Sequence, residues 1–510
     1  MATDAVTVHE PVASERSRWL VLAVVGIAFA AVVTALTVMN VALPSAQRAL
    51  HFTTADRQWV VTAYSLAFGS LLLAGGKLAD LLGRRTTFLV GLVGFAGVSA
   101  VGGASTSFAM LVAARAGQGA FAALLVPSAL ALLTTTFTDQ KIRATAFGVF
   151  GAIATAGGAV GLLLGGALTE YLSWRWTLYA NLVFAGVAFV GGILLLDRQR
   201  SSNRFQLDVP GVLLESAGMF CIVYGCANAA THGWHASSTW GFLVAGVALL
   251  AGFALWISRA AHPLLPPRVV LDRNRAGSYV AIFVASLALF ATLLFLTYYL
   301  QRTLNYSPIE TGFAFLPISV CLAIAANLST IVLMPRVGPR PVVTAGLVIA
   351  AGAMAWLAQL GAHTSYVAGV LGPIVLAGLG LGLVVAPAIN TGTFGVAPQD
   401  AGVASATVTV GQQLGASIGT SLLNTIFASA VASYIVAHAS SASPGALNAL
   451  AEAHGYRTAF WWACAIAAGG AVVAGLLLRP GPLAAWIKPT AESVEPSGDL
   501  SPAPTTSGAG

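Results

Sequence analysis

The chain has 510 residues, of which 57% are hydrophobic and only 8% are charged, and its formal net charge is +7. A soluble protein of this length carries roughly a quarter charged residues, so the composition excludes a water-soluble globular protein. The cations lie in segments between apolar runs, so the positive charge does not indicate nucleic-acid binding. We predict an all-α integral membrane protein, because a spanning backbone must pair its polar groups within each helix.

Fourteen apolar runs are long enough to cross a bilayer as helices, which takes about 20 residues each. The first run is too long for the apolar region of a cleavable signal peptide. The predicted spans are residues 19–43, 58–76, 86–105, 108–135, 144–168, 175–196, 209–230, 240–258, 276–300, 311–334, 341–360, 366–391, 401–433 and 458–478.

Lysine and arginine predict the orientation, because they concentrate in cytoplasmic loops. With both chain ends in the cytoplasm, most cations fall in cytoplasmic segments. Arg115 lies inside a span. The cations left in outside loops are Arg48, Arg57, Arg175, Arg302 and Arg457. The small and polar segment 437–455 is predicted to be an external loop.

The chain contains an internal repeat. Gly83-Arg84-Arg85 in one short loop corresponds to Gly338-Pro339-Arg340 in another, and Pro127 and Pro387 recur at a similar separation. Spans 1–6 therefore match spans 9–14, which is a transporter architecture with the substrate path between two halves. The predicted parts are a cytoplasmic N-terminus (1–17), a six-helix half (18–196), an inserted helix pair (197–275), a second six-helix half (276–479) and a disordered cytoplasmic tail (480–510).

Short motifs along most of the chain match one known family. The main motif runs from Gly76 to Arg85 between spans two and three. Further matches are Asn40-Val41-Ala42-Leu43-Pro44, Arg115-Ala116-Gly117-Gln118-Gly119, Gly157 to Gly166, Ser173-Trp174-Arg175-Trp176, Tyr299-Leu300-Gln301 and Tyr306-Ser307-Pro308. Residues 18–480 resemble the fourteen-span drug:proton antiporters of the major facilitator superfamily (the EmrB/QacA type). The resemblance implies the major facilitator fold in a bacterial cytoplasmic membrane.

The resemblance implies a gating role for the loop between spans two and three. In the family, the carboxylate at the position of Asp80 meets a helix N-terminus and an arginine, and this contact closes the cytoplasmic end. Pro335 stands at the corresponding position of the second copy, so we expect an asymmetric gate. The alternative is a positively charged turn without a gating role. The candidate gating residues are Gly76, Lys77, Asp80, Gly83, Arg84 and Arg85.

Two further motifs lie within spans. A cation such as Arg115 is costly there unless it meets water or a partner. The resemblance implies a role in proton transfer, and the alternative is an arginine that reaches interfacial water. A stripe of glycines in span five predicts close helix packing, although Leu162 replaces the family's proline. These glycines are Gly157, Gly161, Gly165 and Gly166.

The chain departs from the family at Ala35, where most members carry an aspartate. Proton antiport needs a carboxylate whose proton affinity responds to its surroundings. The remaining candidates are Glu215 inside span seven and Glu170 near the outer end of span five, and each has the alternative of a paired or water-facing acid. Candidate cavity residues are Asn40, Gln118, Asn181, Tyr298, Asn327, Asn390 and Gln412.

The sequence therefore predicts a secondary exporter of lipophilic drugs or natural products, coupled to protons. The alternatives are a uniporter, an exporter of a single endogenous metabolite, and a non-transporting membrane sensor or scaffold. No nucleophile–base cluster, metal-ligand spacing or P-loop indicates an enzyme, a metal, a cofactor or an ATP-driven pump. The predicted partners are the small substrate, protons and lipid, and the sequence identifies no accessory efflux partner.

Overall fold

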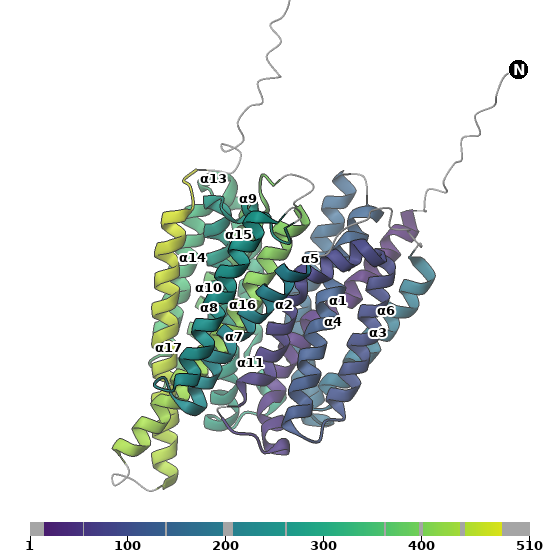
Figure 1. Cartoon of the computed structure of the whole chain (residues 1–510). Helices are drawn as coiled ribbons and strands as arrows, with labels where there is room; N and C mark the ends of the chain where they lie inside the picture. Colours follow the sequence, from purple (N-terminus) through teal and green to yellow (C-terminus); the bar gives the residue numbers. More distant parts are fainter. Residues whose placement is uncertain are drawn as a thin grey trace, which may run out of the picture.

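The computed structural model describes residues 15–54, 56–137, 140–196, 208–260, 263–361, 364–396, 401–438 and 444–481. All regular elements in these ranges are helices (Figure 1). Most of the predicted N-terminal segment 1–17 and of the tail 480–510 lies outside the described residues. The first group of helices is α1 (Glu15–Leu50), α2 (Gln58–Leu82), α3 (Arg84–Gly103), α4 (Phe108–Thr136), α5 (Gln140–Tyr171) and α6 (Trp176–Leu195).

The chain then forms a helix pair and a second group. The pair is α7 (Val209–His232) and α8 (Ser237–Arg259), and the short α9 (Pro267–Val270) follows. The second group contains π-helical turns, labelled η, within its spans. It consists of α10 (Arg273–Tyr298), η1 (Tyr299–Thr303), α11 (Pro308–Ala314), α12 (Leu316–Leu328), η2 (Ser329–Leu333), α13 (Met334–Val337), α14 (Pro339–Leu357), η3 (Tyr366–Leu371), α15 (Gly372–Thr393), α16 (Ala401–Ala437) and α17 (Pro444–Leu477).

Thirteen helical segments of the described chain are long and apolar enough to cross a membrane. Helix α5, whose side chains are described only in part, is not among them, so the count of fourteen stays a prediction. The predicted external loop 437–455 is wrong for most of its length, because α17 begins at Pro444. Proline is well placed at a helix start and the alanine-rich segment after it favours helix.

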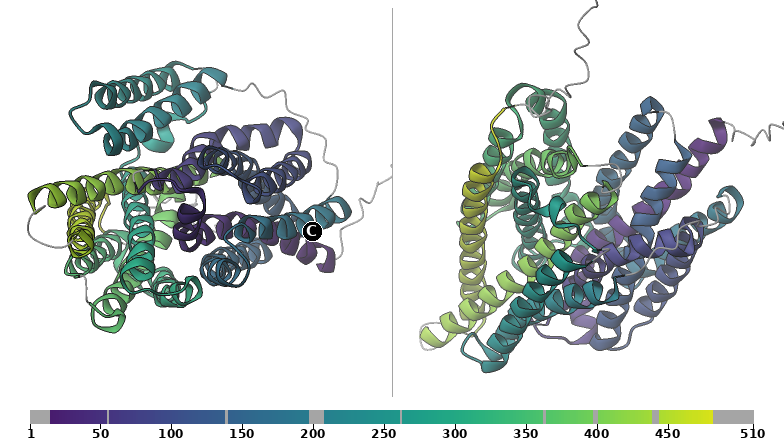
Figure 2. Two further views of the ribbon diagram at one scale, coloured as in Figure 1. Left: turned by 90° about the horizontal axis from the view of Figure 1, so that it is seen from below. Right: turned by 45° about the horizontal axis from the view of Figure 1, so that its top comes forward.

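The two groups repeat one packing pattern, and Figure 2 shows them side by side. In the first group, α1 packs on α5 and α6, α2 packs on α4, and α3 packs on α4 and α6. In the second group, α10 packs on α16 and α17, α12 on α15, and α14 on α15 and α17. These contacts correspond when spans 1–6 are matched with spans 9–14. They support the predicted repeat, while the boundaries 18–196, 197–275 and 276–479 stay predictions.

Both copies of the repeated loop turn on a glycine with positive φ. Gly83 separates α2 from α3 with φ 89°, and Gly338 separates α13 from α14 with φ 80°. Glycine adopts this backbone conformation without the steric cost that other residues meet. We call the end of the bundle that holds these two glycines the proximal end. The distal end holds the loops 51–57 and 304–307.

The largest cluster of buried side chains that joins the two groups lies toward the distal end. It joins residues of α1 and α2 to residues of α10, α16 and α17. Two further clusters belong mainly to one group each, although Val410 of α16 packs with the first group. The ribbons of the two groups diverge toward the proximal end (Figure 2).

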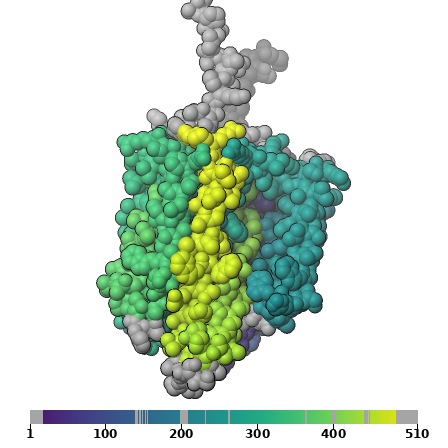
Figure 3. Space-filling model, turned by 90° about the vertical axis from the view of Figure 1, so that its left-hand side faces the viewer, coloured from purple at the N-terminus to yellow at the C-terminus, as the bar shows by residue number. Residues whose placement is uncertain are grey.

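The pair α7–α8 lies against one interface between the groups, where α2 meets α16. Ser216 Oγ of α7 donates to the Ser70 carbonyl of α2 at 3.2 Å, and Thr425 Oγ1 of α16 donates to the Cys226 carbonyl of α7 at 3.0 Å. Helix α7 therefore bonds to both groups. In Figure 3, α17 in yellow runs the height of the molecule beside this pair in teal.

Candidate functional site

Hydrogen bonds join the two groups at the distal end, and we call these bonds the distal contact. Tyr298 Oη donates to Gln47 Oε1 at 2.7 Å, and Arg302 Nη2 donates to the same oxygen at 3.1 Å. Gln301 Nε2 donates to the Val41 carbonyl at 2.9 Å. Two side chains of the turn η1, together with Tyr298 at the end of α10, therefore donate hydrogen bonds to α1.

The distal contact continues between α2 and α16. Thr62 Oγ1 lies 3.0 Å from Thr420 Oγ1 and 3.2 Å from Ser421 Oγ. Arg57, directly before α2, is 1% exposed and its Nε donates to Asn424 Oδ1 at 2.8 Å. Burial lowers the pKa of the Arg57 guanidinium from its ordinary value. Arg57 lies in the loop before α2, and its buried side chain is part of the interface between the groups.

The other interface between the groups joins α5 to α11. Glu170 Oε2 accepts a hydrogen bond of 2.9 Å from the Ile309 backbone nitrogen at the start of α11. A carboxylate is favourable beside the free N–H groups of a helix start. Gly166 lies one turn earlier, and a Cβ there would be 2.6 Å from the Pro308 carbonyl oxygen. The bond of Glu170 is thus part of the distal contact, and Gly166 packs closely beside it.

Gly166→Ala is expected to separate α5 from α11, because the added Cβ would meet backbone atoms that cannot rotate away. Overpacking of this kind costs about 1–3 kcal/mol. Spin labels at Tyr171→Cys and Phe313→Cys, in a background without the native cysteines, should report longer distances. Gly157→Ala is the control, since its Cβ would lie 3.6 Å from Val33 Cβ, an ordinary contact. An unchanged distance distribution in the Gly166→Ala protein would contradict the prediction.

The other glycines of the stripe pack against α1. A Cβ at Gly161 would lie 2.1 Å from Thr37 Oγ1, and a Cβ at Gly165 would lie 2.8 Å from the Val38 carbonyl oxygen. The close packing that the sequence predicted for span five is therefore present at Gly161, Gly165 and Gly166. Gly157 has ordinary contacts only.

Arg115 lies in the middle of the first group and is fully buried. Its Nε donates to the Val60 carbonyl at 3.0 Å, and its Nη1 donates to the Ala35 carbonyl at 3.1 Å and to Gln118 Oε1 at 2.7 Å. Gln118 Nε2 donates to Ser99 Oγ at 2.7 Å. This network connects α1, α2, α3 and α4, so Arg115 does not reach interfacial water.

The ring of Tyr64 covers Arg115, with the guanidinium carbon 4.5 Å from the ring centroid. The described residues place no carboxylate in an ion pair with Arg115. Where the family carries its span-one acid, this chain offers only the Ala35 backbone carbonyl. Backbone oxygens, an amide and an aromatic face therefore surround the cation.

Glu215 lies on the face of α7 that meets α2. It is 2% exposed, and its Oε2 has no hydrogen-bond partner among the described residues. Ser216 and Met219 on neighbouring positions both contact Ser70 of α2. Glu215 therefore lies beside an interface between the groups, although its helix belongs to the inserted pair.

The predicted gating loop is described in part. Asp80 belongs to α2, but its side chain lies outside the described ones, so its gating role stays a prediction. Arg85 Nη2 donates to the Ile193 carbonyl at 2.9 Å, and Arg84 Nη1 reaches the Ala131 carbonyl at 3.5 Å. Both arginines thus attach the start of α3 to other helices of the first group. Gly76 and Lys77 lie in the last turns of α2.

The structure does not gather the candidate cavity residues in one place. Tyr298 belongs to the distal contact, and Gln118 belongs to the Arg115 network. Asn40 and Asn181 are buried, and neither amide atom of Asn181 has a hydrogen-bond partner in the described part of the chain. Three others lie on the second group: Asn327 and Asn390 are exposed, and Gln412 is half-buried.

Sequence reasoning missed most of the distal contact. The position of Arg57 between two predicted spans gives no sign of its partners. Gln47 follows the first predicted span and Asn424 lies inside the thirteenth, and each resembles an ordinary polar residue. The segment from Tyr299 to Gln301 was noticed as a motif without a role. Because the partners of these residues lie hundreds of positions away, no local pattern reveals them.

The molecule thus consists of two helix groups that share one packing pattern and are bonded to each other at the distal end. The profile of the Major Facilitator Superfamily matches residues 25–420. The chain therefore belongs to this superfamily and is a multi-pass protein of the cell membrane. A bacterial homologue of the human lysosomal transporter Spinster, solved in an inward-facing form, has the same fold with a TM-score of 0.64 at 15% identity. That match covers 91% of this chain and 98% of the other.

Two curated relatives are similar over most of their length. The puromycin resistance protein pur8 of Streptomyces alboniger is 45% identical over 463 residues, which are 90% of this chain and 91% of that protein. The cephamycin export protein CmcT of Amycolatopsis lactamdurans is 39% identical over 393 residues, covering 76% of this chain and 81% of that protein.

Proposed function

We propose that this protein exports a drug-like natural product from the cell by alternating access, driven by protons that move inward. The relatives support the cargo class, since they are named for antibiotic resistance and export. The distal contact is the observation that carries the mechanism. Two groups that are bonded at the distal end and diverge at the proximal end fit one state of a rocking cycle.

The lysine and arginine distribution makes the distal end the outer one, so this state would take up cargo from the cytoplasm. Opening toward the outside then requires the bonds of Gln47, Glu170 and Asn424 to break. The cost of breaking them must be matched by contacts that form only in the other state. The predicted latch at Asp80, at the proximal end, is suited to supply such contacts.

Glu215 is the acid that we assign to proton coupling. An ionisable group buried within the membrane is a functional candidate by default, and Glu215 Oε2 has no hydrogen-bond partner among the described residues. It lies beside the interface of α2 and α16, where movement of the groups changes its surroundings. Glu170 was the other candidate, but its hydrogen bond to Ile309 supports a role in closing the distal end.

The absence of an acid at Ala35 favours one alternative, a uniporter or single-metabolite exporter that uses no protons. The two functions differ in one measurement. Puromycin is added to the solution around everted membrane vesicles that contain the protein. Its accumulation inside the vesicles is followed with and without a protonophore. Uphill transport that collapses with the protonophore supports antiport, and transport unaffected by it would establish the alternative. Vesicles that behave like protein-free ones would refute the export function itself.

Glu215→Gln is expected to reduce uphill transport in these vesicles to the level of protein-free vesicles, because an amide cannot exchange a proton. Downhill exchange of puromycin should remain, since the distal contact is intact. Glu452→Gln is the control, because Glu452 forms a partly exposed 3.7 Å ion pair with Arg302, and such pairs contribute little. Full uphill transport by the Glu215→Gln protein would remove Glu215 from the coupling mechanism.

A further inference from the structure

Arg57 is held by aromatic rings of the opposite group. Its guanidinium carbon lies 4.1 Å from the ring centroid of Tyr298, 4.8 Å from that of Phe427 and 5.9 Å from that of Phe295. Its Nε donates to Asn424 Oδ1, and its Nη2 has no hydrogen-bond partner among the described residues. We call Phe295, Tyr298 and Phe427, with the Asn424 amide, the aromatic cage.

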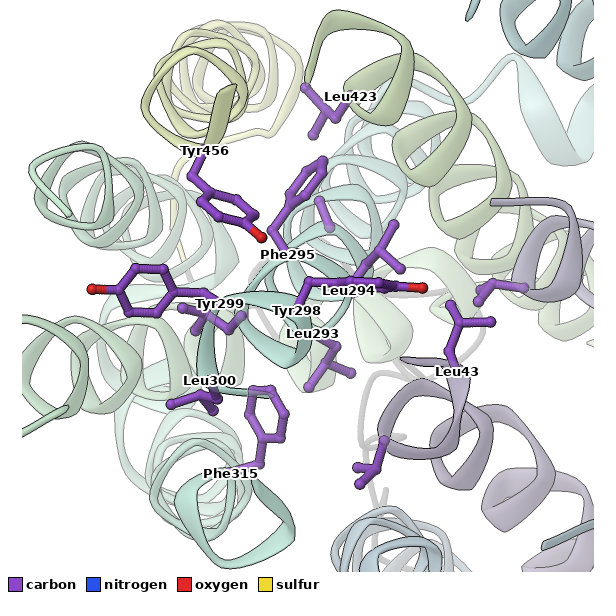
Figure 4. Close-up of a cluster of buried hydrophobic side chains, with 14 of the residues drawn as sticks. Leu43, Leu293, Leu294, Phe295, Tyr298, Tyr299, Leu300, Phe315, Leu423 and Tyr456 are labelled. Atoms are coloured by element: carbon purple, nitrogen blue, oxygen red, sulfur yellow. The ribbon is translucent and has the colours of Figure 1, made fainter. Parts of the chain in front are cut away.

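The aromatic cage is built by the second group alone. Phe295 and Phe427 stack at 5.6 Å between centroids, and Tyr456 packs on both at 6.4 Å and 4.9 Å. In Figure 4, Tyr298 points from α10 toward Leu43 of the first group, while Tyr299 points the opposite way. Because Phe295, Phe427 and Tyr456 support one another, this part of the cage does not depend on Arg57 for its shape. Tyr298 is hydrogen-bonded to Gln47 of the first group.

Outward opening changes what the cage contains. Arg57 belongs to the first group, so separation of α2 from α16 at the distal end withdraws its guanidinium. The three rings and the Asn424 oxygen then face the space through which cargo leaves, while Arg302 of the same group stays over Tyr298, 5.0 Å from its ring centroid. Aromatic faces with a polar acceptor form the kind of site that binds organic cations. A neutral molecule gains no such attraction.

We propose that the aromatic cage is an exit-side binding site for the positively charged group of a lipophilic organic cation, and that Arg57 replaces this group when the distal end closes. The inference rests on the export function proposed above. The closing movement would bring a tethered cation into the cage and so displace the cargo outward. Among the described residues no carboxylate forms an ion pair with Arg57, and ring faces with one amide oxygen hold a cation weakly enough for release.

The test is binding of tetraphenylphosphonium to the full-length protein in lipid nanodiscs. Arg57→Gln removes the competing cation and should lower the dissociation constant about tenfold. Adding Tyr298→Leu to this protein should abolish the gain in tetraphenylphosphonium affinity. The Arg57→Lys protein should bind tetraphenylphosphonium as the wild type does. Arg175→Gln is the control, because Arg175 stacks on Trp174 at 4.6 Å within the first group only. The neutral triphenylphosphine oxide should show no gain with any variant.

A second measurement uses the wild-type protein, in case the Arg57 variants do not fold. Saturating tetraphenylphosphonium should shift spin labels at Tyr171→Cys and Phe313→Cys toward longer distances, and triphenylphosphine oxide should not. An unchanged affinity in the Arg57→Gln protein, a gain that survives Tyr298→Leu, or an equal response to the neutral compound would overturn the inference. Binding is measured without a proton gradient or transport, so this result stands apart from the vesicle experiment.

Discussion

Arg115→Leu is expected to lower strongly the amount of correctly folded protein in the membrane. The substitution deletes three hydrogen bonds and leaves Gln118 Oε1 buried without its donor. A buried polar group that loses its partner costs about 1–3 kcal/mol, and the network joins four helices of the first group. We therefore expect a loss of roughly 2–4 kcal/mol in unfolding free energy and no measurable transport by the protein that remains.

Fluorescence-detected chromatography and the thermal unfolding midpoint measure this loss. Arg48→Leu is the control, because Arg48 is exposed and donates only to Ser45 Oγ at 3.2 Å. The Arg115→Lys protein should be intermediate, since lysine keeps the charge but its single ammonium nitrogen cannot match the planar guanidinium, whose Nε and Nη1 reach acceptors on three helices. An Arg115→Leu protein with wild-type yield and unfolding midpoint would show that the network does not support the fold.

Gly119→Ala is expected to have an effect of similar size. A Cβ at this position would lie 2.2 Å from the Tyr64 carbonyl oxygen and 2.9 Å from the Phe68 nitrogen. Both are backbone atoms, so α2 and α4 must move apart. That movement also displaces Tyr64, whose ring covers Arg115. We expect the unfolding free energy to fall by about 3 kcal/mol and transport to fall with it.

Gly97→Ala is the matched control for this prediction. Gly97 is exposed on α3, and a Cβ there would meet no atom within 4 Å. Alanine favours helix over glycine by about 0.5–1 kcal/mol, so this protein should unfold at the same temperature or slightly higher. Equal unfolding midpoints for the two variants would contradict the packing argument.

Much of the fold could be predicted from the sequence. Apolar runs locate the helices because the bilayer fixes their length, and the Gly83 and Gly338 loops reveal the repeat because both need the same backbone turn. The error at 437–455 has a related cause. Helices α16 and α17 continue past the predicted spans on small residues, and hydropathy does not register a helix that leaves the apolar layer.

The candidate site was less predictable. Glu215 and Arg115 could be selected, because an ionisable group inside an apolar run is conspicuous. Their surroundings could not be predicted, because a backbone carbonyl such as that of Ala35, which accepts a hydrogen bond from Arg115, leaves no mark in the sequence. Glu170 was selected as an acid, but its placement against the start of α11 depends on how the groups meet. The burial of Arg57 could not be predicted, because its aromatic partners come from helices far along the chain.

The position of α7–α8 makes the two sides of the transporter unequal toward lipid. On one side, these helices cover the line where α2 meets α16, and α7 bonds to both. On the other side, α5 meets α11 and α12 without an inserted pair. A hydrophobic compound dissolved in the membrane therefore meets helices of both groups directly along α5 and α12, whereas on the covered side it meets α7 and α8 first.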